Sequence, residues 1–219
     1  ETGMDRISVL DGFRLSSNYV FRYLVKENYG KNPEEYLKKF YTYGIAGRYD
    51  FELDGLAQGI VPDTKREGWS RTDLIQSAIG YSVQTTPLHM VTFYNGVANK
   101  GRLMKPYVVE SIERNGKVVA AFKPQVLNGA ICSRATADTL VRALTTVTSS
   151  GTGSKVKNAK CQIAGKTGTA WIALDAKYVE KGGSRYVDSE GRKQYQASFV
   201  GFFPADAPKY TAIITIYSK

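Results

Sequence analysis

The chain has 219 residues, of which 42% are hydrophobic and 23% are charged, a composition typical of a folded globular domain. No stretch is long and apolar enough to cross a bilayer as a helix. The formal net charge is +10, but the basic residues are scattered and lack the interleaved aromatic side chains of nucleic-acid-binding surfaces. We therefore interpret the charge as mainly solvated surface charge, with acidic lipid headgroups or an acidic wall polymer as partners that it would suit.

The first two thirds of the chain carry the apolar spacing and the start signals of helices. Asn32 is predicted to cap one helix, with Glu35 completing a capping box, and Thr86 and Ser133 are predicted to cap two longer ones. A hairpin turn is expected at Asn115-Gly116. The predicted helices cover residues 7–15, 19–26, 33–43, 72–79, 87–100 and 134–150, and the predicted hairpin covers residues 107–122.

The last part of the chain has the composition of β-strands. Residues 161–172, 197–203 and 210–218 are rich in β-branched, apolar and aromatic side chains. A short Pro-Ala-Asp-Ala-Pro connection joins the last two predicted strands and favours an antiparallel pair. Residues 173–196 form a long polar excursion, which we interpret as a flap or an extra hairpin.

These elements predict an α+β fold built from two successive parts. Residues 4–157 are expected to form a mainly helical lobe with a small hairpin. Residues 158–219 are expected to supply the strands of an antiparallel sheet. Residues 1–3 precede Met4 and are interpreted as the remnant of an appended tag outside the fold.

The two cysteines and the single histidine form no metal or redox motif. Cys132 and Cys161 lack a Cys-x-x-Cys spacing and are interpreted as two separate, partly buried thiols, with one disulfide left open as an alternative. His89 falls inside a predicted helix and is interpreted as a structural residue of that helix. We expect no metal site.

The predicted strand at residues 161–172 reads Cys-Gln-Ile-Ala-Gly-Lys-Thr-Gly-Thr-Ala-Trp-Ile and carries a charge within an apolar run. A phosphate-binding loop would require a glycine five positions before Gly165, and Lys160 stands there instead. A neutral turn is the second interpretation, because Lys-Thr-Gly is a short string of common residues. The third interpretation is a catalytic strand edge that holds an anionic substrate, and it requires companion motifs elsewhere in the chain.

Ser16-Ser17-Asn18 supplies such a companion, between two predicted helices. The simplest account is that Ser17 or Asn18 caps the helix that follows. However, Ser-x-x-Lys, Ser-Asp-Asn and Lys-Thr-Gly are the signature set of class A β-lactamases and penicillin-binding proteins. This chain has the second motif as Ser-Ser-Asn and the third motif intact.

Three longer segments, residues 78–109, 147–170 and 197–216, extend this likeness in the same order along the chain. Together with the two motifs, they make the chain resemble the transpeptidase domain of class B penicillin-binding proteins. The resemblance implies a β-lactamase/transpeptidase-like α+β fold. It also implies a serine acyl-enzyme that cross-links peptidoglycan stem peptides, is acylated by β-lactams and needs no metal or organic cofactor.

The resemblance implies roles for residues of both motifs. Ser16 would relay a proton toward the leaving amine, Asn18 would orient the substrate amide, and Lys166 would supply positive potential across the cleft. The substrate-binding residues would be Ser17, Thr167, Gly168 and Thr169, and the Thr169 backbone N–H would form half of the oxyanion hole.

The acylating serine of the resembled family lies in a Ser-x-x-Lys motif before Ser-x-Asn. Only residues 154–157 fit that formula here, in the wrong order and in a Gly/Ser-rich stretch, so Ser154 is interpreted as a decoy. We therefore expect part of a transpeptidase without the nucleophile helix, N-terminal strands and C-terminal helix. Such a chain would be inactive alone, with sheet edges and one sheet face uncovered.

The expected partners are peptidoglycan stem peptides, β-lactam antibiotics and proteins of the division or elongation machinery. A membrane anchor outside this chain would hold the protein on the periplasmic face of the bacterial inner membrane. A β-lactamase is a less suitable interpretation, because residues 34–38 lack the asparagine of its Glu-x-x-Leu-Asn segment. A β-lactam sensor and a non-catalytic envelope-binding module stay open as alternatives.

Overall fold

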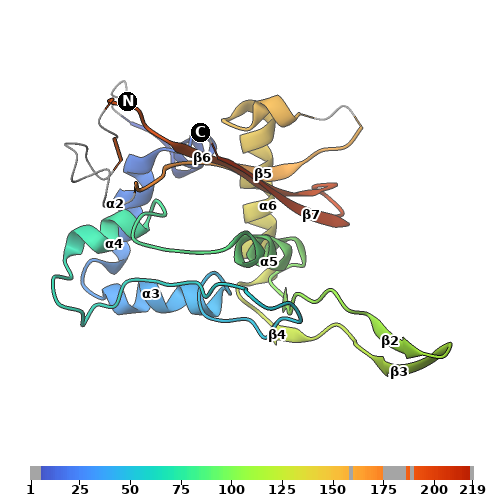
Figure 1. Cartoon of the computed structure of the whole chain (residues 1–219). Helices are drawn as coiled ribbons and strands as arrows, with labels where there is room; N and C mark the ends of the chain where they lie inside the picture. The colour runs from blue at the N-terminus through green and yellow to red at the C-terminus, as the bar shows by residue number, and fades with distance from the viewer. Residues whose placement is uncertain (1–5, 158–159, 175–185, 188–189, 218–219) are drawn as a thin grey trace.

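The computed structural model describes residues 6–157, 160–174, 186–187 and 190–217 (Figure 1). The helices are α1 Val9–Arg14, α2 Asn18–Tyr29, α3 Pro33–Thr42, α4 Arg71–Ser77, α5 Pro87–Ala98, α6 Arg134–Ser150 and the 3₁₀ turn η1 Ser154–Val156. The strands are β1 Leu103–Met104, β2 Ser111–Arg114, β3 Lys117–Ala121, β4 Val126–Asn128, β5 Ala164–Trp171, β6 Tyr195–Phe203 and β7 Tyr210–Tyr217. All the predicted helices are present, with ends shifted by a few residues. No described helix is both long and apolar enough to cross a membrane.

The helix caps follow the sequence with one exception. The Thr86 hydroxyl accepts the His89 N–H at the start of α5, and the Ser133 hydroxyl accepts the N–H three residues on at the start of α6. The capping box predicted at Asn32 is wrong, because the Asn32 side chain makes no capping hydrogen bond. Its backbone ψ of 69° departs from the extended conformation of a typical cap, and Glu35 instead forms an ion pair with Lys39 at 3.3 Å.

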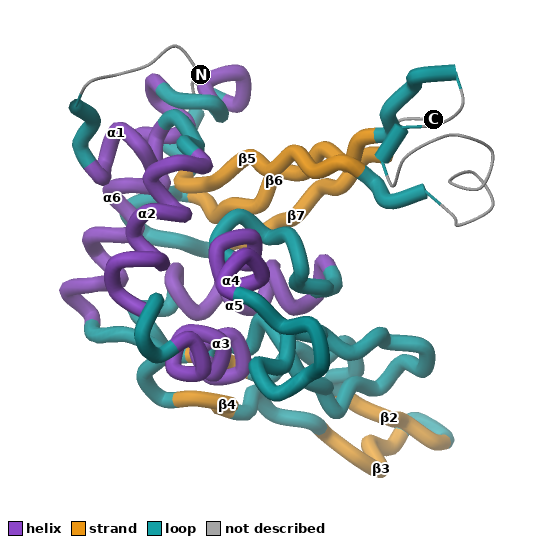
Figure 2. Tube along the Cα trace, turned by 90° about the vertical axis from the view of Figure 1, so that its left-hand side faces the viewer, coloured by secondary structure: helices purple, strands orange, loops and turns teal. Residues whose placement is uncertain are grey.

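The sheet is antiparallel in the order β5-β6-β7, as the sequence predicts. Gly165 of β5 pairs with Gly201 of β6, and Gly201 in turn pairs with Ala212 of β7. Figure 2 shows this sheet lying over α5, with α1, α2 and α6 gathered at one of its ends. The predicted excursion at residues 173–196 lies largely outside the described residues.

One face of the sheet forms the main core with α5 and α6. Phe202 and Ala164 are fully buried there, together with Val200. From the helices, Val97 and Leu144 pack into the same cluster. The single histidine lies within α5, as predicted, and is also fully buried. Burial of one such large apolar side chain stabilises the fold by about 1.5–3 kcal/mol, so this face anchors the helices to the sheet.

The opposite face of the sheet is open. Ile214 and Ile216 on β7 are 62% and 64% exposed, and Tyr210 on the same strand is 64% exposed. Within the described part of the chain, β5 and β7 each pair on one side only. The prediction of an uncovered face and of free sheet edges is therefore confirmed for the described residues.

The hairpin β2–β3 forms as predicted and projects away from the body of the molecule (Figure 1). Asn115 and Gly116 both have positive φ, 55° and 71°, which a tight hairpin turn requires. Strands β1 and β4, of two and three residues, pair with each other. The sequence did not predict them, because such short strands carry no periodic pattern. Cys132 and Cys161 are free thiols, so the disulfide alternative is wrong.

Candidate functional site

The turn between α1 and α2 places Ser16 at the end of the sheet. Ser16 has a φ of 57°, a left-handed conformation that is uncommon for a residue with a side chain. The turn is closed by a 2.8 Å hydrogen bond from Ser17 N–H to the Gly12 carbonyl. Gly12 has no side chain, and a Cβ there would collide with Val20, so the two helices approach each other closely.

Lys166 is the third residue of β5, on the face of the sheet that carries Val200. Its Nζ donates a hydrogen bond to Ser16 Oγ and another, at 3.2 Å, to the Thr167 carbonyl oxygen. Burial lowers the pKa of the Lys166 ammonium to about 8. The structure thus joins the two predicted motifs, which lie 150 residues apart in sequence.

Thr152 belongs to this site and was missed by the sequence analysis. Its Oγ1 lies 3.2 Å from Ser16 Oγ and 2.7 Å from Thr167 Oγ1. The residue follows α6 in the segment Gly-Thr-Gly. A polar residue flanked by two glycines, in the connection between α6 and the Lys-Thr-Gly strand, is the signal that could have found it, although the sequence gives no partner for its hydroxyl.

Ser17 and Asn18, the other predicted residues of the first motif, make no contact with Lys166 among the described interactions. The Ser17 hydroxyl accepts the Val20 N–H at 3.4 Å and so caps α2, as the simplest account of that motif held. Asn18 is the first residue of α2 and is exposed, and its side chain makes no hydrogen bond to another described residue. Its place two residues after Ser16 keeps it at the same turn.

Gly168 and Thr169 continue β5 beyond Lys166 and are exposed. They pair with Ser198 and Ala197 of β6, and a Cβ at Gly168 would come within 2.7 Å of Ser198 Oγ. Thr167 and Thr169 are two residues apart on one strand, so their side chains lie on the same face. The site is therefore a strand edge with one ammonium and several hydroxyl groups, suited to holding an anionic group. Within the described residues, no cluster of His, Cys, Asp or Glu is arranged to hold a metal ion.

Ser154 begins the turn η1 and Lys157 follows it, and both residues are exposed. Neither side chain forms a hydrogen bond with Ser16 or Lys166 among the interactions of the described residues. The interpretation of Ser154 as a decoy stays a prediction.

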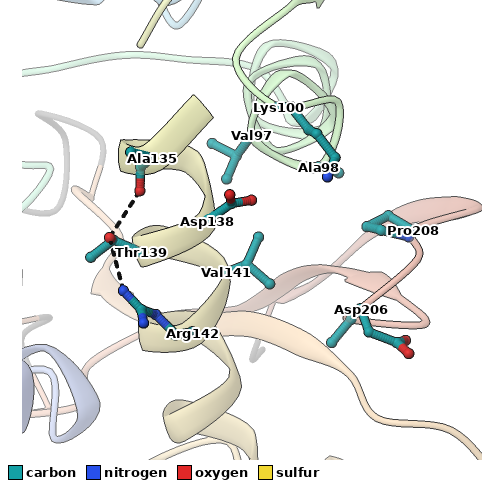
Figure 3. A pocket seen from close by; sticks show the side chains of 11 residues that line it. Val97, Ala98, Lys100, Ala135, Asp138, Thr139, Val141, Arg142, Asp206 and Pro208 are labelled. Carbon is teal, nitrogen blue, oxygen red and sulfur yellow. Dashed lines mark hydrogen bonds between the residues drawn. The ribbon is translucent and has the colours of Figure 1, made fainter. Parts of the chain in front are cut away.

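A cavity of about 450 Å³ lies near the opposite end of α6 from Thr152 (Figure 3). Asp138 and Val141 of α6 line one side of it, and Lys100 and Pro208 line others. Its lining includes none of Ser16, Thr152 and Lys166, so this cavity is separate from the site at Ser16.

The chain is similar in sequence to a family of known proteins and to several curated members. The family described as the penicillin binding protein transpeptidase domain matches residues 1–219. Stage V sporulation protein D of Bacillus subtilis is 27% identical over 191 residues, which cover 87% of this chain and 27% of that protein. The peptidoglycan D,D-transpeptidase MrdA of Acinetobacter baumannii is 26% identical over 231 residues, which cover 100% of this chain and 33% of that protein. The chain thus spans about a third or less of the curated relatives it matches.

Solved structures share the fold. Penicillin-binding protein 3 of Mycobacterium tuberculosis, solved with aztreonam, has a TM-score of 0.76 at 26% identity, covering 95% of this chain and 44% of that one. Penicillin-binding protein 2B of Streptococcus pneumoniae has a TM-score of 0.76 at 20% identity, covering 96% of this chain and 35% of that one. The predicted α+β, transpeptidase-like fold is confirmed.

Proposed function

The chain belongs to the family of penicillin-binding protein transpeptidase domains, and on that basis we propose that it forms part of a serine D,D-transpeptidase that cross-links peptidoglycan stem peptides. The observation that carries this proposal is the hydrogen bond from Lys166 Nζ to Ser16 Oγ. A contact between the Ser-x-Asn turn and the Lys-Thr-Gly strand is what a shared cleft for serine acyl transfer requires.

The proposed reaction has two steps. A serine Oγ gives its proton to the lysine of its own Ser-x-x-Lys motif and attacks the carbonyl carbon of the penultimate D-alanine, and the bond to the terminal D-alanine breaks as its nitrogen takes up a proton. Ser16 is placed to deliver that proton, because it can draw a replacement from the Lys166 ammonium. An amine of a neighbouring stem peptide then attacks the ester carbon, its nitrogen loses a proton, and the serine oxygen leaves as it takes a proton up again.

The strand edge would bind the substrate. In this proposal the Lys166 ammonium and the hydroxyls of Thr167 and Thr169 hold the terminal carboxylate, and Gly168 leaves room for the substrate backbone. The Thr169 N–H would supply one oxyanion-hole donor, and Asn18 would bind the substrate amide. Ser17 contributes by fixing the turn that carries Ser16.

The acylating serine would come from a part of the longer protein other than the residues described. No Ser-x-x-Lys pair in the described residues contacts Lys166 or Ser16, so we propose that the 219-residue chain alone is inactive. We also propose that the whole protein acts on the periplasmic face of the bacterial inner membrane, with division or elongation proteins as partners.

Labelling with a fluorescent penicillin tests the proposal. The 219-residue chain should stay unlabelled, while the protein extended to the length of its curated relatives should be labelled. In the extended protein, Lys166→Ala should reduce the labelling rate by about 100-fold, in the range found for single electrostatic groups of active sites. A matched control is Lys155→Ala, which removes an exposed lysine of η1.

Other outcomes would point to the alternatives. An extended protein that binds peptidoglycan but is never labelled would contradict the enzyme proposal and favour an envelope-binding module. A labelled protein that hydrolyses the β-lactam rapidly would be a β-lactamase. A labelled protein that never transfers the acyl group to an amine would be a sensor.

A further inference from the structure

Three side-chain hydroxyls form a continuous row from the ammonium of Lys166 to the open strand edge. Ser16 Oγ accepts a hydrogen bond from Lys166 Nζ, and Thr152 Oγ1 lies 3.2 Å further along the row. Thr167 Oγ1 follows at 2.7 Å from Thr152 Oγ1. Thr152 is the only member of this row that lies in neither motif, and it is the group through which the others connect.

The loop that carries Thr152 is fixed against the turn of α1. The Thr152 N–H donates to the Arg14 carbonyl oxygen at 3.3 Å, and the Arg14 guanidinium donates to the Ser150 carbonyl oxygen at 2.9 Å. A Cβ at Gly151 would overlap the Arg14 carbonyl oxygen, so only glycine permits this approach. Gly153 N–H closes the loop on the Val147 carbonyl oxygen at 3.0 Å. The Thr152 hydroxyl is therefore held in place by backbone contacts on both sides.

Each hydroxyl has a single proton, so the donor at one end of the row sets the direction of donation in every hydrogen bond that follows. A hydroxyl has one proton to donate and two lone pairs to accept. When the Lys166 ammonium donates to Ser16 Oγ, the Ser16 proton can go to Thr152 and the Thr152 proton to Thr167. The Thr167 proton is then left for a group in the cleft. Hydrogen bonds in such a row polarise one another, so the positive charge at one end strengthens the donor at the other.

We propose that Thr152 is a positioning residue for carboxylate recognition, which turns the Thr167 hydroxyl into a directed donor for the terminal carboxylate of the substrate. This inference rests on the proposed function, because it names the group that the proposed strand edge recognises. It predicts that Thr152 matters for ligands that end in a carboxylate and is nearly neutral for ligands that do not. A residue that merely held the loop in place would affect both kinds of ligand alike.

The first experiment uses the extended protein and two variants. Thr152→Val keeps the β-branched shape and removes the hydroxyl, and Thr152→Ser keeps the hydroxyl. The readout is kcat/KM for diacetyl-Lys-D-Ala-D-Ala and for the same peptide with a C-terminal amide. Thr152→Val should lower kcat/KM for the carboxylate peptide about tenfold, the size expected for one hydrogen bond to a charged group, and leave the amide peptide within about twofold. Thr152→Ser should restore most of the loss.

A control variant and two outcomes make the test decisive. Thr139→Val removes a hydroxyl that donates to the Ala135 carbonyl oxygen on the exposed side of α6, and it should change neither rate. Equal losses for both peptides with Thr152→Val would overturn the inference, as would equal losses with Thr152→Val and Thr152→Ser.

The second experiment uses the 219-residue chain and does not depend on catalysis. Binding of the two peptides is followed by NMR at the methyl groups of Thr152 and Thr167. The carboxylate peptide should bind the unaltered chain several-fold more tightly than the amide, and this preference should disappear in Thr152→Val. If the extended protein proves inactive but this preference is found, the proposed function fails and the role of Thr152 in carboxylate binding stands. If the preference is absent, the inference is wrong whatever the extended protein does.

Discussion

The two faces of the β5-β6-β7 sheet have similar apolar side chains but opposite surroundings. On the inner face, Val200 and Phe202 are buried against α5 and α6, and Lys166 continues the same face to the candidate site. On the outer face, Ile214 and Ile216 are more than three-fifths exposed. The apolar composition of the strands therefore predicted the sheet but not which of its faces is packed. The candidate site lies at the end of the packed face.

The largest expected effect sharpens this contrast in stability. Phe202→Ala should lower the free energy of unfolding by about 3–5 kcal/mol, because it leaves a cavity in a fully buried position. Ile214→Ala, on the open face, should change it by less than about 1 kcal/mol. Urea denaturation followed by circular dichroism measures both. Similar losses at the two positions would mean that the outer face is covered in solution.

The next effect concerns the junction between α1 and α6. Gly151→Ala should lower the free energy of unfolding by about 1–3 kcal/mol, because the added Cβ must displace the Arg14 carbonyl or the loop. Gly129→Ala is the matched control, since a Cβ there meets no atom within 4 Å. A destabilisation by Gly129→Ala as large as that by Gly151→Ala would remove the argument for a constrained loop.

Lys166 should lower the free energy of unfolding in a pH-dependent way. Burial lowers the pKa of its ammonium to about 8, below the value of 10.5 in an unfolded chain. Between these values the unfolded state binds more protons, so stability should rise as the pH increases from 8 to 10.5. Lys166→Met should remove this slope and raise stability at pH 7, by on the order of 1 kcal/mol after allowance for solvent screening. Thermal unfolding of both proteins across pH 7–10 measures the difference, and parallel curves would contradict the prediction.

The smallest expected effect is at His89, a fully buried residue of α5. Its Nδ1 lies 2.7 Å from Thr86 Oγ1 and its Nε2 lies 3.1 Å from the Gly47 carbonyl oxygen. Burial lowers the pKa of His89 below 6.5. The stability contributed by neutral His89 is therefore present above pH 6.5 and is lost as the pH falls through the folded-state pKa, by about 1 kcal/mol or less.

His89 is the only histidine of the chain, so an NMR titration of its ring reports its pKa without ambiguity. A midpoint at or above 6.5 would contradict the prediction. His89→Gln should remove the acid-dependent loss of stability, and unfolding at pH 5 and pH 7 measures it.

Local signals predicted most of the fold. The caps at Thr86 and Ser133, the hairpin turn at Asn115-Gly116 and the antiparallel strands all depend on residues close together in sequence, and all are confirmed. The capping box at Asn32 failed because its backbone conformation, set by the surrounding turn, overrides the residue preference.

The candidate site was only partly predictable. The family resemblance predicted that Ser16 and Lys166 share one site, and in the structure they form a hydrogen bond. Thr152 could not be found in this way, because its role follows from a hydroxyl group 136 residues away from it in sequence. A threonine between glycines predicts a turn, but only the three-dimensional structure shows which hydroxyl group lies next to that threonine.

The open outer face has a practical consequence for handling this chain. Isoleucines at 214 and 216 lie on one face of β7, and among the described residues no strand pairs with the outer edge of β7, so its backbone groups there can pair with a neighbouring molecule. At high protein concentration two molecules can pair these strand edges through backbone hydrogen bonds, and dilution reverses such pairing by mass action. Light scattering over a concentration series is therefore the first quality check for any preparation of this polypeptide.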